Sequence, residues 1–287
     1  MRSTAATPSP SNVARVGFIG LGDMGGALAA RIIGAGFPAV LWARRAEALR
    51  SFSGPTVETA GTPAELAARV DLIGICVWDD KAVWEVVGGH DGVLAGCRPG
   101  TVIAIHSTIE PDMCLELATA AAEQGAVILD APVSGGRDVA LTGKLVVAVG
   151  GDREVLERSR PVLASFGDPV IHLGALGAGQ LAKLVNNALL AANLALAHDA
   201  LRLAASRGLQ PDAMAQVLRH GSGRSFALDV AVASRSSAEV RNRAVPPLSK
   251  DVRCLNAVLR RSGDATALRA AAEAGLQRLS DPACWTW

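Results

Sequence analysis

The 287-residue sequence contains no tyrosine, five phenylalanines and five tryptophans, so aromatic residues make up only 3% of the chain. Proteins that bind single-stranded nucleic acid without sequence preference stack the bases on aromatic side chains. The formal net charge is +1, so no excess of basic residues favours a nucleic acid or an anionic membrane. We therefore expect neither nucleic acid nor a membrane among the partners of this protein.

Cysteine is also scarce, and its five positions are Cys76, Cys97, Cys114, Cys254 and Cys284. The number is odd and no Cys-x-x-Cys pair occurs, which argues against a disulfide framework and against a zinc site. The five histidines show no metal-ligand spacing either. We expect no metal cofactor and a reducing, cytoplasmic location.

Long apolar runs are missing too: no stretch of eighteen apolar residues occurs, so we expect no transmembrane helix. Residues 1–12 are rich in Ser, Thr, Pro and Ala without an apolar stretch, and we predict a disordered leader rather than a secretory signal. Half of the residues are hydrophobic, which is typical of a globular protein with a sizeable core. The length allows one large domain or two ordinary ones.

The chain between residues 13 and 173 alternates between short apolar segments and helical patterns. This alternation predicts an α/β domain with a mainly parallel sheet. The predicted strands are 14–19, 39–42, 71–77, 101–105, 127–129, 144–149 and 170–172. The predicted helices are 24–34, 63–69, one that opens at 79–81, 111–124 and 152–165.

A Gly-x-Gly-x-x-Gly motif lies where the first predicted strand meets the first predicted helix. Its residues are Gly20, Leu21, Gly22, Asp23, Met24 and Gly25. Such a motif between a strand and a helix is typical of a dinucleotide site. The first glycine allows a tight turn, the second lets the pyrophosphate approach the backbone, and the third lets helix and strand pack closely. The helix N-terminus offers free N–H groups to the phosphates.

The end of the second predicted strand indicates which dinucleotide binds. An NAD site places Asp or Glu here to hold the ribose 2′-hydroxyl. This sequence has Trp42-Ala43 followed by Arg44 and Arg45, so no carboxylate repels a 2′-phosphate and two guanidiniums are available to bind it. We predict NADP, with NAD possible. In the alternative interpretation both arginines are solvated, with Glu47 as a partner.

Polar residues follow two later strands. Ser107 and Thr108 lie past a strand's carboxyl end, where open α/β sheets bind ligands. Either residue could instead cap the helix at 111–124, and the two roles can coexist. His106 is interpreted as a packed histidine. Ser134, followed by Gly135 and Gly136, offers a hydroxyl and exposed N–H groups together, which suits a carboxylate.

The second half, residues 174–287, is almost wholly helical in pattern. Its longest predicted helix spans 177–208, and Lys183 and Asn187 lie on one face of it because they are four residues apart. Two interpretations follow from the helix alone: a solvated lysine beside an asparagine, or a buried pair that is used chemically. Further helices are predicted at 211–219, 225–234, 248–261 and 266–279, with a loop or short helix at 235–243 and a break at Pro246-Pro247.

Four stretches together resemble the β-hydroxyacid dehydrogenases, the group that contains 3-hydroxyisobutyrate dehydrogenase and several semialdehyde reductases. The stretches are GFIGLGDMG at 17–25, DAPVSGG at 130–136, GAGQLAKLVNN at 177–187 and KD at 250–251. The resemblance implies a Rossmann domain at 13–173, a long interdomain helix, and an all-helical domain at 174–287 that serves dimerisation, in a homodimer or homotetramer.

The resemblance also implies a role for individual residues. Lys183 would be the general acid/base and Asn187 would orient it and the substrate. Ser134, Gly135 and Gly136 would bind the carboxylate of a small substrate. Cofactor contacts would come from the glycine motif, Val77 and Thr108, while Lys250 would contact cofactor or substrate and Asp251 would support the site.

These residues together predict an NADP-dependent oxidoreductase that interconverts a small 3-hydroxy acid and its semialdehyde. In reduction, hydride reaches the aldehyde carbon and Lys183 protonates the developing alkoxide, most efficiently if burial or a cation lowers its pKa. Two alternatives are an imine reductase on the same fold and a non-catalytic NADPH-binding module. A lysine at position 183 argues against the imine reductases, which carry other residues there.

Two departures from related families bear on the substrate. The 6-phosphogluconate dehydrogenases have His-Asn where this chain has Asn186-Asn187, and a Glu where it has Leu190, so a phosphorylated sugar acid is not expected. Val139 stands where the family usually has Gly, and Arg137-Asp138 adds charge beside it. Both changes fall just after Ser134, Gly135 and Gly136.

Overall fold

The computed structural model describes residues 15–235, 238–264 and 266–285. Its contacts divide the chain into two units, Met1–Gln180 and Leu181–Trp287. The division falls inside the first turn of helix α8 (Ala178–Ser206), a few residues past the predicted boundary at 173. The predicted leader at 1–12 lies outside the described residues.

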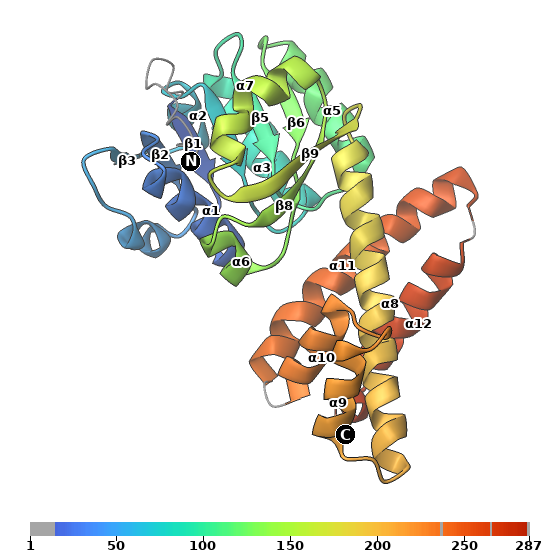
Figure 1. Ribbon diagram of the computed structural model, residues 1–287. Coiled ribbons are helices and arrows are strands. Elements are labelled where there is room, and N and C mark those ends of the chain that lie inside the picture. The colour runs from blue at the N-terminus through green and yellow to red at the C-terminus, as the bar shows by residue number, and fades with distance from the viewer. Residues whose placement is uncertain (1–14, 236–237, 265, 286–287) are drawn as a thin grey trace, which may run out of the picture. The chain divides into compact units, whose positions relative to one another are not determined.

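In unit 1 the strands form a single sheet (Figure 1). They are β1 (Val16–Ile19), β2 (Ala39–Trp42), β3 (Val57–Thr59), β4 (Leu72–Ile75), β5 (Val102–Ile105), β6 (Val127–Asp130), β7 (Val133–Ser134), β8 (Leu145–Gly150) and β9 (Gly167–Gly174). Strands β1 to β6 are parallel in the order β3-β2-β1-β4-β5-β6. This is the order of a Rossmann fold, so the predicted fold class is confirmed.

Helices cover both faces of this sheet. They are α1 (Asp23–Gly34), α2 (Pro63–Ala67), α3 (Asp80–Gly88), α4 (Val93–Gly96), α5 (Pro111–Ala122), α6 (Arg137–Leu141) and α7 (Arg153–Leu163), with a 3-10 turn η1 (Ala46–Ser51). Successive side chains of a strand point to opposite faces. Phe18 accordingly joins a buried cluster with α1 and α7, while Ile19 joins another with α2, α3 and α5. The sheet is therefore buried on both faces.

Beyond β6 the sheet is no longer purely parallel. Strand β8 runs antiparallel to β6 and β7, and β9 runs parallel to β8. The short elements β3, β7, α4 and α6 were not predicted. Each has at most five residues, which is too short for a helical or alternating period to show in the sequence.

The regular elements in the described residues of unit 2 are all helices. It contains most of α8, then α9 (Pro211–His220), α10 (Phe226–Arg235), α11 (Ala238–Ser262), α12 (Ala267–Leu279) and a 3-10 turn η2 (Pro282–Trp285). The predicted break at Pro246-Pro247 is wrong, because α11 runs through both prolines. Each proline removes one helical N–H, yet its fixed φ is compatible with a helix. Buried Leu248, Val252 and Leu255 on the next turns pack into the core, and this packing outweighs the lost hydrogen bonds.

Alanines let α8 pack closely against its neighbours in unit 2. A Cβ on Gly275 of α12 would lie 2.9 Å from the Ala191 carbonyl oxygen, so the two helices meet backbone to backbone. The opposite stripe of α8 is apolar but exposed, with Leu196 and Leu203 more than half exposed. By its length and composition alone, α8 is long and apolar enough to cross a membrane. Of its most apolar 18-residue segment 44% is buried, and core helices of soluble proteins can have the same length and composition.

Candidate functional site

The glycine motif in unit 1 forms the turn expected of a dinucleotide site. Gly20 has φ +92°, and a Cβ there would meet the Cys76 carbonyl oxygen at 2.2 Å. A Cβ on Gly25 would lie 1.9 Å from the Gly20 carbonyl oxygen, so helix and strand pack with no room for a side chain. Gly22 has nothing within 4 Å of its Cβ position and no side chain caps α1. The backbone at the helix start is therefore open to a phosphate.

The remaining motif residues hold this turn in place. Leu21 and Met24 are partly buried and pack against the core, while Asp23 is the first residue of α1. Val77 lies next to the turn, because its Cγ1 would be 3.0 Å from a Cβ on Gly20. The structure thus brings Val77 and the glycine motif together.

The ends of β4 and β5 are joined by Ser107. Its hydroxyl oxygen accepts a hydrogen bond from the Val77 N–H at 2.8 Å. The capping alternative for Ser107 and Thr108 is wrong, because Glu110 precedes α5 and no side-chain cap bond forms there. Thr108 follows directly and is partly buried at this edge of the sheet.

His106 is a packed histidine, as predicted. Its Nδ1 lies 2.8 Å from the Ala131 carbonyl oxygen, and its ring stacks on Phe18 with an interplanar angle of 10°. Burial lowers the pKa of His106 to about 4, against a weaker opposing effect of the hydrogen bond to Ala131. A neutral, buried ring of this kind contributes packing rather than proton transfer near neutral pH.

Arg44 and Arg45 lie in the connection between β2 and η1, and both are exposed. Among the described residues neither is seen in an ion pair with Glu47, the partner considered in the alternative interpretation. At the end of β2, Trp42 donates to the Gly61 carbonyl oxygen at 3.2 Å. Two free guanidiniums are thus available beside the ribose position of a Rossmann site.

The predicted carboxylate loop follows β7. Ser134 pairs with Val146 of β8, and Gly135 and Gly136 both have positive φ, +137° and +84°. A Cβ on Gly135 would lie 2.9 Å from Cγ1 of Val139, so this position has no space for a side chain. Gly136 then precedes α6 without a side-chain cap, which leaves backbone N–H groups at the helix start.

A buried network that the sequence did not reveal ties these loops to the start of α8. Asp130 accepts hydrogen bonds from the N–H groups of Gly177 and Gln180, both at 2.7 Å. The Gln180 side chain donates to the Ser107 carbonyl oxygen at 2.8 Å and accepts from the Ile109 N–H at 3.1 Å. Burial raises the pKa of Asp130, against the lowering effect of these N–H donors.

In unit 2 the second predicted group comes together around Asp251, which is 2% exposed. The Asn187 amide donates to Asp251 Oδ2 at 2.5 Å, and Lys250 Nζ lies 3.1 Å from Asp251 Oδ1. Asn186 donates to Asn187 Oδ1 at 3.0 Å, so both ends of the Asn187 amide are held. Asn187 itself is buried.

Lys183 lies one turn before Asn187 on α8 and is partly buried. Burial lowers its pKa to about 8; the Lys250 cation acts in the same direction, and the Asp251 carboxylate opposes both. An amine with such a pKa can both give and take a proton near neutral pH. The predicted site residues therefore fall into two groups, one in each unit.

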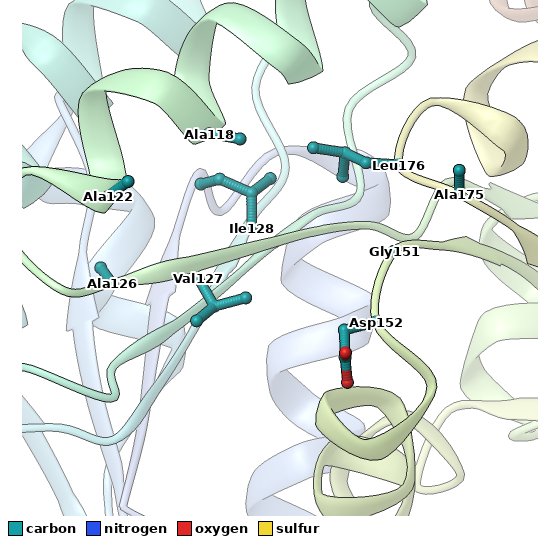
Figure 2. Close-up of a pocket in the computed structure, with 9 residues that line it drawn as sticks. All are labelled: Ala118, Ala122, Ala126, Val127, Ile128, Gly151, Asp152, Ala175 and Leu176. Carbon is teal, nitrogen blue, oxygen red and sulfur yellow. The ribbon is translucent and has the colours of Figure 1, made fainter.

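One hollow of unit 1 contains none of these residues. Figure 2 shows its lining from the segment α5 to β6, the connection between β8 and α7, and the segment before α8: Ala118, Ala122, Ala126, Val127, Ile128, Gly151, Asp152, Ala175 and Leu176. The lining is mostly apolar, and Asp152 caps α7 through its carboxylate. Within the described parts of the chain, no three His, Cys, Asp or Glu side chains lie close enough to hold a metal ion.

Comparisons with known proteins agree with both units. A family model described as the NAD binding domain of 6-phosphogluconate dehydrogenase matches residues 15–174. A model described as NAD-binding of NADP-dependent 3-hydroxyisobutyrate dehydrogenase matches residues 177–282. The mitochondrial 3-hydroxyisobutyrate dehydrogenase of Mus musculus is 35% identical over 79% of this chain and 68% of its own length.

Solved structures give the same result. The 3-hydroxyisobutyrate dehydrogenase of Mycobacterium tuberculosis with L-serine has a TM-score of 0.80 at 28% identity, over 94% of this chain and 95% of its own. Psf3 in complex with NADP+ and 2-OPP has a TM-score of 0.82 at 29% identity, over 92% of each chain. The Streptomyces aurantiacus imine reductase, at 22% identity and a TM-score of 0.66 over 92% of this chain and 93% of its own, shares the fold alone.

The fold, the open glycine turn and the lysine–asparagine–aspartate cluster define a nicotinamide-dependent oxidoreductase of the Rossmann type. The chain belongs to the β-hydroxyacid dehydrogenase family, the group that contains the 3-hydroxyisobutyrate dehydrogenases.

Proposed function

We propose that this enzyme interconverts a small 3-hydroxy acid and its semialdehyde, with NADP as the cofactor and Lys183 as the general acid/base. The observation that supports it most directly is the Lys183 amine, whose pKa burial lowers to about 8, on the same face of α8 as an Asn187 held by Asp251. The open turn at Gly22 fits a dinucleotide, because no side chain fills the space over it. A bound nicotinamide supplies hydride in reduction and accepts it in oxidation.

The direction of proton transfer depends on whether the Lys183 amine is protonated. In reduction the aldehyde oxygen gains negative charge as hydride reaches its carbon, and the Lys183 ammonium gives that oxygen a proton. In oxidation the neutral amine takes the hydroxyl proton while hydride leaves the same carbon. An amine with a pKa of about 8 is populated in both forms near neutral pH, which suits both directions.

The other residues bind and orient. Asn187, fixed at both ends of its amide by Asn186 and Asp251, would hydrogen-bond the substrate oxygen and keep it facing Lys183. Ser134 and the N–H groups of Gly135 and Gly136 would hold the substrate carboxylate. Lys250, whose charge is partly balanced by Asp251, would contact the cofactor or the substrate.

Turnover of a panel of semialdehydes and 3-hydroxy acids, followed by nicotinamide absorbance, tests this proposal. Lys183→Ala is expected to lower kcat at least about a hundredfold, the lower end of what general acid–base catalysis contributes. Lys81→Ala, which removes a lysine that is 85% exposed, is the control and should leave kcat unchanged. Undiminished turnover in Lys183→Ala would contradict the assigned role.

The same panel separates the alternatives. Reduction of cyclic imines without turnover of any hydroxy acid would favour an imine reductase. Tight NADPH binding with no turnover on the whole panel would favour a non-catalytic module.

Ser134→Ala is expected to raise KM for the acid while the Kd of NADPH stays constant, because the hydroxyl would contact the substrate and not the cofactor.

The preference for NADP rests on Arg44 and Arg45, which are exposed beyond β2 where no carboxylate is present. Arg44→Ala is expected to weaken NADPH binding about tenfold and to leave NADH binding unchanged, because only NADPH carries the 2′-phosphate. Arg50→Ala removes another exposed arginine, in the last turn of η1, and serves as the matched control. A wild-type preference for NADH that Arg44→Ala does not alter would contradict the proposal.

A homodimer or homotetramer is proposed on the exposed apolar stripe of α8. Leu181, Val185, Leu189, Leu196 and Leu203 all lie on it and are 42–63% exposed. A Leu196→Glu substitution is expected to shift the mass measured by light scattering toward the monomer. We place the enzyme in the cytoplasm because none of the five cysteines, all of which the structure describes, forms a disulfide. Recovery of the native protein in the membrane fraction would contradict this.

A further inference from the structure

An ion pair in unit 1 joins the two loops that carry the predicted cofactor and substrate contacts. Arg137 Nε lies 3.3 Å from Asp23 Oδ1. Asp23 is the first residue of α1, directly after Gly22 of the glycine motif. Arg137 is the first residue of α6, directly after Gly136 of the loop that follows β7. The guanidinium is therefore located at the N-terminus of the dinucleotide-binding helix.

The position of Arg137 is fixed by packing on the other side of α6. Ala140 is buried, and Val139 packs into the cluster that contains α1. Helices α1 and α6 pack along each other, and Gly143, just after α6, lies against Arg31 in the last turn of α1. The short helix thus starts beside the glycine turn and spans about 8 Å at the helical rise, and the residue two positions after it contacts the Arg31 guanidinium.

The start of α1 carries the Asp23 carboxylate at the point where a diphosphate would bind. In a Rossmann site the diphosphate of the dinucleotide binds at the N-terminus of the first helix, where N–H groups and the helix dipole favour negative charge. Asp23 places a carboxylate at the same point, and two anions side by side repel each other. The cation of Arg137, beside that carboxylate, removes the repulsion. Asp138 also approaches this guanidinium, but only at 4.0 Å and from a 95% exposed position.

We propose that Arg137 is a binding residue for the diphosphate of the dinucleotide, held in place by Asp23 and offsetting its charge. Because Arg137 follows Gly136 directly, diphosphate binding would also order the loop that holds the substrate carboxylate. The inference rests on dinucleotide binding, which the family membership shows, and not on the identity of the substrate.

Equilibrium binding of several ligands to Arg137→Gln tests the proposal. The variant is expected to bind NADPH, NADH and ADP-ribose each about tenfold more weakly, because all three contain the diphosphate. Adenosine 2′-monophosphate lacks the diphosphate, so its Kd should not change. Arg137→Lys keeps the charge and should retain binding to within about threefold.

Two further variants complete the test. Lys144→Gln removes a cation that pairs with Asp168 at 2.7 Å just beyond the other end of α6, and its binding of all four ligands should equal that of the wild type. Asp23→Asn added to Arg137→Gln should recover about threefold of the lost affinity, because it removes the carboxylate charge that Arg137 offsets. All ion-pair partners are exposed, so melting temperatures should stay within about 2 °C of wild type.

Four results would overturn the proposal. Unchanged NADPH and NADH binding in Arg137→Gln would show that the guanidinium makes no contact. Weaker NADPH but unchanged NADH would assign it to the 2′-phosphate instead. An equal loss for adenosine 2′-monophosphate would indicate general damage to the site. Absence of recovery in the double variant would show that Asp23 is not the charge that Arg137 offsets.

Discussion

Replacing Lys183 with methionine is expected to stabilise the folded protein at neutral pH while it removes the proposed catalytic amine. Burial is the main cause of the lowered pKa of Lys183, and the Lys250 cation adds to it. A charged amine in this position therefore costs folding free energy. Methionine has a similar length and no charge, so it can occupy the same space on α8.

The size of the effect follows from the pKa. Lowering the pKa of Lys183 from 10.5 to about 8 corresponds to about 3 kcal/mol of preference for the neutral amine. Below pH 8 the amine is protonated in both the folded and the unfolded chain, so the full penalty applies. Between about pH 8 and 10.5 only the unfolded chain holds the proton, and the stability of the wild type rises with pH. Lys183→Met should therefore be up to about 3 kcal/mol more stable at pH 7, and this advantage should shrink toward pH 10.

Urea unfolding at pH 7, 8, 9 and 10, followed by circular dichroism, measures this difference. Lys81→Met, at an exposed position, should match the wild type at every pH. Lys250→Met should be less stable than wild type, because it leaves the buried Asp251 carboxylate without its cation. A Lys183→Met variant that is less stable at pH 7, or whose advantage does not depend on pH, would refute the reasoning.

Three other substitutions are informative. Asp251→Asn removes the anion that raises the pKa of Lys183. The ammonium that donates the proton in reduction should then be lost at a lower pH, so reductase activity should begin to fall below about pH 8. An unchanged pH–rate profile would argue against this coupling. Gly25→Ala should cost about 3 kcal/mol or more and abolish NADPH binding, since its Cβ would lie 1.9 Å from the Gly20 carbonyl oxygen; wild-type melting and binding would contradict this geometry. Asp130→Ala leaves two buried N–H donors without an acceptor and should lower the free energy of unfolding by about 2–4 kcal/mol in urea titrations, whereas a loss below about 1 kcal/mol would show that water replaces the carboxylate.

Local patterns in the sequence were sufficient for most of the architecture. The strand–glycine–helix order around Gly20 specifies a Rossmann turn, because a positive φ and close packing can be met only by glycine. The apolar runs at 71–77 and 101–105 predicted buried parallel strands, and β4 and β5 lie within them. The four-residue spacing of Lys183 and Asn187 placed both on one helix face before any contact was known.

Other features depend on residues that are distant in the chain, and no local pattern reveals them. Asn187 and Asp251 are 64 residues apart, and Asp130 and Gln180 are 50 apart, so only the folded chain shows that they bond. The continuity of α11 through its prolines was likewise decided by packing, since local preference favours a break there.

The sequence by itself determined the fold class and the dinucleotide turn, because backbone geometry and helical periodicity depend on neighbouring residues. It also placed Lys183, the proposed acid/base, on one helix face with Asn187. The tertiary structure alone decided how that amine is tuned and how Arg137 meets Asp23. Burial and charge pairing depend on which distant side chains share a small volume, and that is settled only when the helices and the sheet pack.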